Sequence, residues 1–211
     1  MIIPKIIFDY SLEDEVSRVK YTVKKYAWYV ENGYKPTFPQ TLIERLEKGE
    51  NIEDPEIEKS IRAEYIESEY AEIKDQITKG WKEIESKFFL QLQTLGRTLP
   101  EEYFINLTKY GTSGSYGYPN DVQINYRKRK MDDIPFVIAH EIVHLAIEDL
   151  ISKYKIEHWT KERFVNLTMN RFFPDKKSLQ RDPENSEQIS QIFESNFPNI
   201  ERIIIEISDI K

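Results

Sequence analysis

The feature that most constrains the fold is a long run of apolar residues at helical spacing between residues 54 and 96. Apolar side chains recur there every three or four residues, with one gap at Glu69. This period places them along one face of a helix, and such a face is buried against other elements. The run predicts one long helix, or two helices broken near Gly80, ending at Gly96. The apolar positions are Ile57, Ile61, Tyr65, Ile73, Ile77, Trp81, Ile84, Phe88, Leu92 and Leu95.

Residues 12–32 show the same helical spacing, with Ser11 as the N-cap and Gly33 just beyond the end. A shorter helix is expected over 39–48. Residues 1–10 contain an apolar run that predicts a short strand or an anchoring segment. We expect the long apolar stripe to pack against the first of these helices, because a helical apolar stripe is the ordinary signature of a core face.

The character of the chain changes after Pro100. Residues 103–110 and 121–127 both predict strands, and a glycine-rich segment, residues 111–120, connects them. The glycine spacing fits neither a phosphate-binding loop nor a dinucleotide-binding turn, and the segment does not join a strand to a helix. We therefore reject nucleotide binding at this segment.

Residues 131–154 predict the clearest helix of the chain. Asp132 or Asp133 can cap it, and Pro135 is tolerated in its first turn. Four further segments are then expected: a helix over 160–173 capped by Thr160, a polar connection over 175–187, a short helix over 188–197 and a terminal strand over 200–207.

These elements together predict an α+β fold. Its N-terminal region, residues 1–99, is mainly helical and packs on a second region, residues 100–211, that holds a small sheet and the helices of residues 131–154 and 160–173. The two regions could also form one continuous domain, since 211 residues suit one large domain or two small ones.

The composition argues against several classes of protein. The hydrophobic fraction is 39% and the charged fraction 32%, as in ordinary folded proteins. The net charge of −7 argues against a nucleic-acid partner, because phosphate binding needs concentrated Lys and Arg. No apolar run approaches the roughly 18 to 20 residues that span a bilayer, and no secretory signal is recognisable at the start. Cysteine is absent, which excludes disulfides and thiolate ligands and fits a cytoplasmic protein.

All three histidines fall within a span of nineteen residues, 140–158. His140 and His144 lie four positions apart in the predicted helix, with Glu141 between them. Residues so spaced lie about 40° apart around a helix axis, so both imidazoles can reach one metal ion. Glu141 points to a neighbouring sector, near a metal-bound water. This is the H-E-x-x-H arrangement, with two zinc ligands and a general base on one element.

Catalytic zinc usually has a third protein ligand and a water. The metzincin pattern H-E-x-x-H-x-x-G-x-x-H is excluded, because Ile147 stands at the Gly position and Leu150 at the third His position. The residues that remain as candidates for the third ligand are Glu148, Glu157, His158 and Glu162.

The motif, followed 18 residues later by Glu162 on a second helix, resembles the gluzincin metallopeptidases, the thermolysin-like class of zincins. The resemblance implies a Zn²⁺ ion held by His140, His144 and Glu162, with Glu141 as general base. It also places Asn166 where the class usually has an Asp that orients a histidine ligand. A neutral amide would orient the ring but would support its basicity less.

The resemblance covers roughly residues 100 to 173 and implies a zincin-like second region. In this class an extended peptide adds to an edge strand before the active-site helix, and residues 121–127 stand where that strand is expected. The implied activity is hydrolysis of peptide bonds in a peptide or protein substrate by a metal-activated water. The oxyanion donor would come from outside the helix, with His158 and Tyr116 as the predicted catalytic residues and Tyr118 as a further candidate.

Two alternatives stay open at this point. The protein could be latent, with the predicted terminal strand paired to the edge strand that the substrate would use, although an ordinary sheet strand is the simpler interpretation. Alternatively, the zinc could be structural and hold two helices together, with both His158 and Glu162 as ligands. The sequence indicates neither the peptide specificity nor the oligomeric state.

Overall fold

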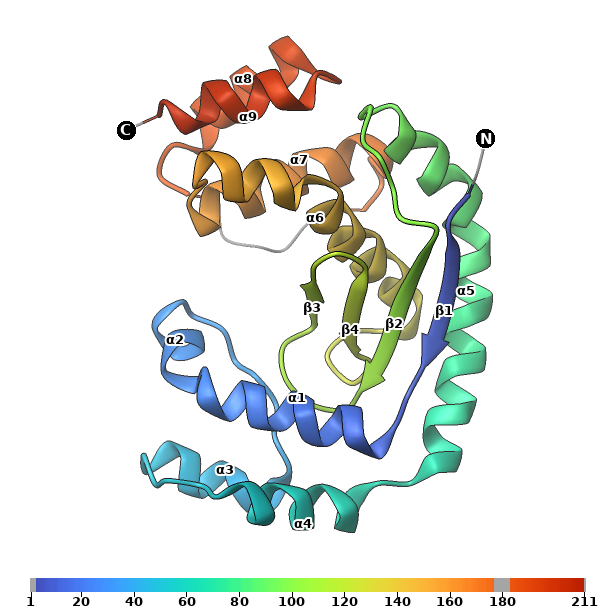
Figure 1. Cartoon of the computed structure of the whole chain (residues 1–211), viewed down its shortest axis with the longest axis vertical. Coiled ribbons are helices and arrows are strands. Elements are labelled where there is room, and N and C mark those ends of the chain that lie inside the picture. The colour runs from blue at the N-terminus through green and yellow to red at the C-terminus, as the bar shows by residue number, and fades with distance from the viewer. Residues whose placement is uncertain (1–2, 177–182, 211) are drawn as a thin grey trace.

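A four-stranded mixed sheet lies inside a frame of helices in the computed structural model, which describes residues 3–176 and 183–210 (Figure 1). The strand order is β1–β2–β4–β3. Strands β1, β2 and β4 run parallel, whereas β3 is antiparallel to β4 and forms an edge of the sheet. The strands are β1 (Lys5–Asp9), β2 (Glu102–Thr108), β3 (Gly114–Gly117) and β4 (Asp121–Asn125).

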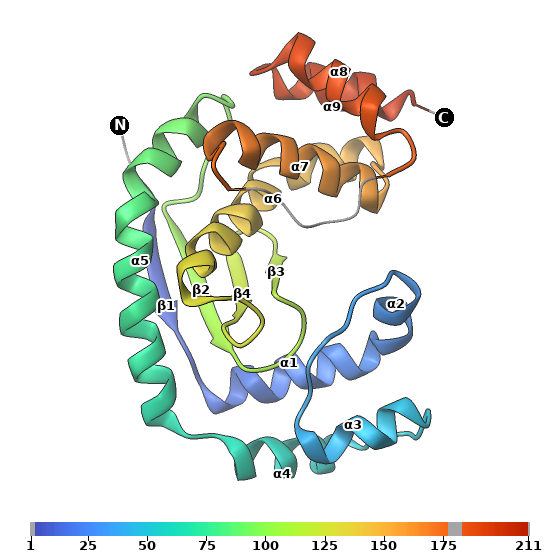
Figure 2. The same cartoon turned by 180° about the vertical axis from the view of Figure 1, so that it is seen from behind.

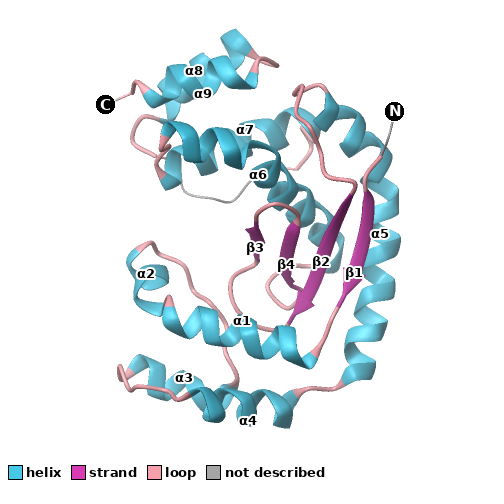
Figure 3. Cartoon of the chain, in the orientation of Figure 1, coloured by secondary structure: helices cyan, strands magenta, loops and turns pink. Residues whose placement is uncertain are grey.

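Helices cover one face of this sheet and both of its ends (Figure 3), and this arrangement confirms the predicted α+β class. A single 3₁₀ turn, Met131–Asp133, leads into α6. The helices are α1 (Leu12–Lys24), α2 (Tyr26–Glu31), α3 (Gln40–Glu47), α4 (Asp54–Glu64), α5 (Glu67–Gln93), α6 (Ile134–Tyr154), α7 (His158–Phe172), α8 (Ser186–Asn196) and α9 (Ile200–Ser208).

The main hydrophobic core lies between the sheet and the pair α5 and α6, which cover the same face (Figures 1 and 2). Alternate residues of β2, namely Tyr103, Ile105 and Leu107, are fully buried there, as expected for a strand with one face on a core. α6 is buried on most sides because its apolar residues do not segregate to one face. The site motif is therefore carried by the most enclosed helix of the fold.

Helices α1, α3 and α4 build a second, smaller hydrophobic cluster, which includes Val19, Leu42 and Ile61. In Figure 1 these helices lie below the sheet, at the carboxyl ends of the parallel strands. β1 pairs along its whole length with β2, from Lys5 opposite Glu102 onward. The first strand of the N-terminal region thus belongs to the same sheet as the strands after residue 100.

The predicted helix boundaries need two corrections in the N-terminal region. Residues 12–32 form two helices, α1 and α2, which are separated at Lys25. The long apolar run is broken at Tyr65 and Ile66, which are extended, and not near Gly80. Gly80 has a packing role instead, because a Cβ there would lie only 3.1 Å from Cγ of Pro135 on α6.

The predicted terminal strand over residues 200–207 is wrong, because this segment forms helix α9. Its buried residues are Ile200, Ile203, Ile204 and Ile207, which is helical spacing. The β-branched residues favour a strand locally, but burial of one face against α6 and α8 decides the structure. The latent alternative was suggested by a terminal strand that needs a partner, and the helix takes the place of that strand.

The predicted edge strand is also corrected. β4, which covers most of residues 121–127, lies inside the sheet between β2 and β3. The edge is β3, a short strand within the glycine-rich segment that we expected to be a connection. Part of the predicted polar connection over 175–187 lies outside the described residues.

Within residues 3–176 and 183–210, no helix combines the length and the apolar character needed to cross a membrane.

Candidate metal centre

Two consecutive helices, α6 and α7, form a hairpin that carries the site. α6 ends at Tyr154, and the left-handed backbone of the C-cap residue Lys155 (φ 52°) turns the chain. α7 begins after Glu157, whose carboxylate accepts hydrogen bonds from the backbone N–H groups of Trp159 and Thr160 at 2.8 and 3.1 Å. Glu157, and not Thr160, is therefore the N-cap. Of the predicted third ligands, Glu157 is engaged in this cap.

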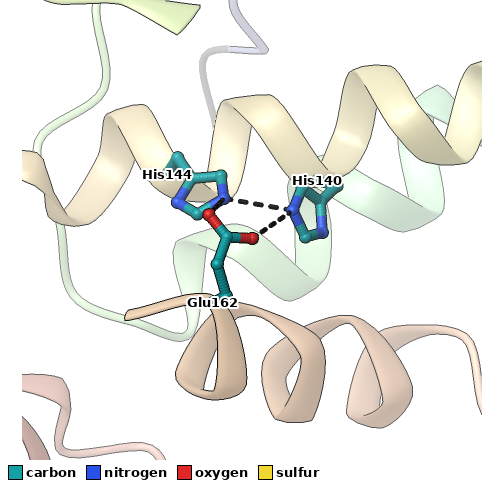
Figure 4. A group of neighbouring side chains, drawn as sticks. All are labelled: His140, His144 and Glu162. Carbon is teal, nitrogen blue, oxygen red and sulfur yellow. Dashed lines mark hydrogen bonds and ion pairs between the residues drawn. The ribbon is translucent and has the colours of Figure 1, made fainter. Parts of the chain in front are cut away.

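The hairpin brings His140 and His144 of α6 against Glu162 of α7 (Figure 4). The two Nε2 atoms lie 3.0 Å apart. Glu162 Oε2 lies 3.4 Å from His140 Nε2, and Glu162 Oε1 lies 3.4 Å from His144 Nε2. All three ligand atoms fall within 4.8 Å of one another. We call these three residues the His–His–Glu group.

The chemistry of this donor set fits a zinc ion. Two imidazole nitrogens and one carboxylate oxygen are the ligand types that a catalytic Zn²⁺ takes, and three of them leave a position for water. The two Nε2 atoms and the two carboxylate oxygens of Glu162 face one another. Each neutral imidazole has only one N–H, so two neutral rings bring at most two protons to these four atoms. Glu162 Oε2 is buried without a hydrogen-bond partner. A cation placed among the donors would satisfy all of them at once.

Burial and mutual charge set the pKa values of the group. Burial lowers the pKa of His144 to about 4, against the opposing effect of Glu162. Burial also acts to lower the pKa of His140, but the adjacent carboxylate of Glu162 and the charge of Glu141 outweigh it and raise that pKa. The pKa of Glu162 falls well below its ordinary value, because the two histidines outweigh its burial. His144 is thus neutral and Glu162 ionised near neutral pH, which are their metal-binding forms.

Glu141, the residue between the two histidines, is buried beside strand β3. Burial raises its pKa to about 7, with Glu162 adding to this effect and His140, Lys161 and Arg18 opposing it. Gly114 of β3 allows the close approach, because a Cβ there would collide with Glu141 Oε1 and lie 2.9 Å from Cγ1 of Val137. A carboxyl group with a pKa near 7 has the affinity for protons that general acid–base catalysis requires.

Tyr116, on strand β3, lies directly over the group. Its ring stacks on His144 with a centroid separation of 4.9 Å. Its hydroxyl donates to Glu148 Oε2 at 2.7 Å and accepts from Lys161 Nζ at 2.8 Å. Tyr116 therefore lies beside the group, its hydroxyl is held by residues of α6 and α7, and its role as an oxyanion donor stays a prediction. Glu148, predicted as a possible ligand, contacts Tyr116 and Ser152 and is not in the group.

His158 lies at the start of α7 and is not one of the three grouped ligands. Its Nε2 is 2.8 Å from the hydroxyl of Tyr34, and its ring contacts Trp28 and Trp159. A four-ligand site that includes both His158 and Glu162, as the structural-zinc alternative requires, is not formed by the described residues.

The His–His–Glu group opens into a cavity of about 490 Å³. The cavity is lined by Glu141, Tyr116, His158 and Asn166 among the predicted residues. Asn166 is buried next to the group, and its role in orienting a histidine stays a prediction. Tyr118 is largely exposed and is not a lining residue.

Sequence reasoning missed three residues near the site. Arg18 of α1 is almost fully buried and donates to Ser115 Oγ and Thr112 Oγ1 around β3, at 2.8 and 3.1 Å. Lys161 and Tyr34 line the cavity. No local pattern marks Arg18 or Tyr34, because their partners lie about a hundred positions away. Lys161 had a usable signal, since it is adjacent to Glu162.

Comparisons of the chain with protein families, with curated proteins and with solved structures found no match.

Proposed function

We propose that this protein is a zinc-dependent metallopeptidase of the gluzincin kind. The strongest support is the convergence of three possible ligand atoms within 4.8 Å of one another, namely His140 Nε2, His144 Nε2 and a carboxylate oxygen of Glu162. The two histidines lie on α6 and the glutamate on α7, and a tight turn joins these helices. The H-E-x-x-H motif supplies two of these atoms, and the third arrives where the resemblance predicts it.

His140, His144 and Glu162 would hold the ion. Bound there, Zn²⁺ would supply a Lewis acid that polarises a peptide carbonyl and acidifies a water molecule. The three chain ligands are all buried or nearly so, and a low-dielectric setting strengthens the ion's electrostatic effect.

Glu141 is the proton carrier in this proposal. Its carboxylate takes a proton from the attacking water and delivers it to the nitrogen of the departing amine, while the water oxygen forms the new bond to the carbonyl carbon. A pKa raised to about 7 by burial suits both transfers. Gly114 has no side chain, which leaves the space that the carboxylate occupies beside β3.

Strand β3 is the proposed binding edge for an extended peptide substrate. It is the last strand of the sheet, and Tyr116 and Gly114 place it against the His–His–Glu group. An extended peptide can add to such an edge through backbone hydrogen bonds. Tyr116 and His158, which flank the group from β3 and α7, are the proposed hydrogen-bond donors to the developing oxyanion. The single O–H of Tyr116 is donated to Glu148 in the structure and would turn from Glu148 to the oxyanion in the reaction.

The test is Glu141→Gln on zinc-loaded protein, with hydrolysis of a mixed peptide library followed by mass spectrometry. We expect turnover to fall by about two to four orders of magnitude while zinc content is unchanged, the range typical of a lost general base. Asp149→Asn is the matched control, because it makes the same chemical change on the same helix at a half-exposed position outside the cavity. Unchanged turnover in Glu141→Gln would contradict the proposal.

A further inference from the structure

The N-terminal region contributes only aromatic residues to the metal cavity. The lining residues that precede residue 100 are four, and all come from the segment of α1, α2 and the following loop: Tyr21, Trp28, Tyr29 and Tyr34. The charged lining residues belong to the opposite wall, after residue 112. In Figures 1 and 2, α2 and its following loop face α7 across the open side of β3. We call the four residues the aromatic wall.

The aromatic wall is held in place by a stack of rings. Tyr34 lies between Trp28 and Trp159, with centroid separations of 5.8 Å to each and interplanar angles of 19° and 10°. Its hydroxyl is fixed by His158 Nε2 at 2.8 Å. Trp28 also packs edge-on against His158 and Tyr29. Trp28 is therefore oriented by its neighbours before any ligand binds.

The outer rings of the wall remain exposed. Trp28 is 40% exposed and Tyr21 is 52% exposed, whereas most large apolar side chains of this protein are buried. Exposed aromatic surface that borders a cavity is typical of a binding site, because its burial by a ligand is favourable and its rigid rings lose little entropy. The wall offers ring faces and hydroxyl groups but no charge.

We propose that the aromatic wall is a specificity subsite that binds a large apolar side chain of the peptide substrate, with Trp28 and Tyr21 as the contact residues. The inference rests on the proposed function in that it assumes a peptide in the cavity. Because the wall carries no charge, it favours an aromatic or aliphatic side chain over Lys or Arg. The competing possibility is that the cation of a Lys or Arg side chain binds over the Trp28 ring.

The experiment measures peptide binding rather than hydrolysis. Glu141→Gln protein, incubated with Zn²⁺, is titrated by calorimetry with capped alanine-rich hexapeptides that differ at one position, which is Phe, Leu, Lys or Ala. We expect the Phe and Leu peptides to bind at least about tenfold more tightly than the Ala and Lys peptides, as burial of one large apolar side chain would give.

Substitutions in the same background locate the subsite. Trp28→Ala and Tyr21→Ala should reduce the preference for Phe over Ala to less than about threefold. Val30→Ala is the matched control, because Val30 is an exposed apolar residue on α2 outside the cavity, and it should keep the preference. Tyr21→Ala removes a half-exposed ring and keeps the test valid if Trp28→Ala does not fold.

Three outcomes would overturn the subsite: no peptide binds, the Lys peptide binds best, or both wall variants keep the preference for Phe. The proposed function fails separately. If the wild type binds the Phe peptide through Trp28 but hydrolyses no peptide, the subsite is supported and the peptidase is refuted. If the protein hydrolyses peptides and neither wall substitution changes its preference, the peptidase is supported and the subsite is refuted.

Discussion

Two buried acidic clusters of this protein differ in how their charge is balanced. In the first, which we call the Lys109 cluster, Lys109 Nζ lies 2.7 Å from Glu69 Oε2, and the Lys109 backbone N–H donates to Glu15 Oε1 at 2.5 Å. Tyr70 donates to Glu15 and Tyr126 donates to Glu69. In the His–His–Glu group, the nearest cation of the described chain, Lys161 Nζ, is 3.8 Å from Glu162 Oε1.

The comparison distinguishes a cluster that the chain neutralises by itself from the candidate metal site. Lys109 is 3% exposed and its ammonium also donates to the carbonyl of Glu64, at the break between α4 and α5. The chain itself thus supplies the counter-charge and ties three elements together. In the His–His–Glu group, three electron-pair donors face one another, an arrangement that is satisfied by a metal ion. Both clusters contain a buried carboxylate, that of Glu15 in one and that of Glu162 in the other, so burial alone does not identify a candidate metal site.

The largest effect is expected from breaking the Lys109 cluster. Lys109→Met removes the buried ammonium from Glu69, which keeps only the exposed Arg127, and from the carbonyl of Glu64. Loss of one partner of a buried ion pair costs about 3–5 kcal/mol, and because Glu69 is 31% exposed we expect the lower end of this range, about 3 kcal/mol. Urea denaturation measures the free energy of unfolding. Lys153→Met removes an exposed ion pair of 3.5 Å and should change that free energy by less than about 0.5 kcal/mol. Equal effects of the two substitutions would contradict a structural role for Lys109.

Zinc should stabilise the folded protein through the His–His–Glu group, and this effect should not depend on the Lys109 cluster. A ligand at a hundredfold excess over its Kd raises the free energy of unfolding by about 2.7 kcal/mol. We expect this increase in the wild type, its reversal by a chelator, and no increase in Glu162→Gln. The same increment should persist in Glu15→Gln, whose change is confined to the Lys109 cluster. Zinc stabilisation of Glu162→Gln that equals that of the wild type would contradict the ligand assignment.

The Lys109 cluster should make stability fall as pH rises. Burial raises the pKa of Glu15 to about 7, although Tyr70, Lys109 and Arg18 oppose it. Below pH 4.5 the carboxyl is protonated in both states, so its contribution is fully present. Between pH 4.5 and 7 only the unfolded chain loses the proton, and roughly 2 to 3 kcal/mol is lost. Between pH 5 and pH 8 the free energy of unfolding should fall by about this amount more in the wild type than in Glu15→Gln, because the other groups that titrate in this window, such as Glu141, contribute in both proteins. Equal changes in the two proteins would refute the assignment.

The smallest effect concerns β3, the strand beside the candidate metal site. Gly114→Ala places a methyl group against Glu141 and Val137, and overpacking of this kind costs about 1–3 kcal/mol. Gly117→Ala on the same strand is the control, because its Cβ would be 3.6 Å from the nearest heavy atom, an ordinary contact. Thermal unfolding measures both. If Gly114→Ala is as stable as Gly117→Ala, β3 does not constrain Glu141.

The difference between the two clusters also explains what the sequence could predict. The His140–Glu141–His144 motif is local, and its geometry follows from helical spacing alone, so its placement on one face of α6 was predictable. The position of Glu162 required the resemblance, because nothing in the spacing of α7 distinguishes it from Glu157. The Lys109 cluster had no local signal, because its contacts join residues 40 to 94 positions apart.

The sheet and the last helix show where local patterns fail. The order β1–β2–β4–β3 depends on pairing between segments about a hundred residues apart. Strand β3 lies in a glycine-rich segment whose composition is typical of a loop. Helix α9 has β-branched residues that favour a strand, but its buried isoleucines follow helical spacing. Giving periodicity more weight than propensity would have predicted it correctly.

The zinc content of the purified protein, measured by mass spectrometry for the wild type, Glu162→Ala and His158→Ala, tests the proposed metal site without any assumption about the substrate. We expect one zinc ion per chain in the wild type and in His158→Ala, and loss of the ion in Glu162→Ala. Absence of zinc from the wild type after reconstitution, or retention of zinc by Glu162→Ala together with its loss from His158→Ala, would show that His140, His144 and Glu162 are not the zinc ligands.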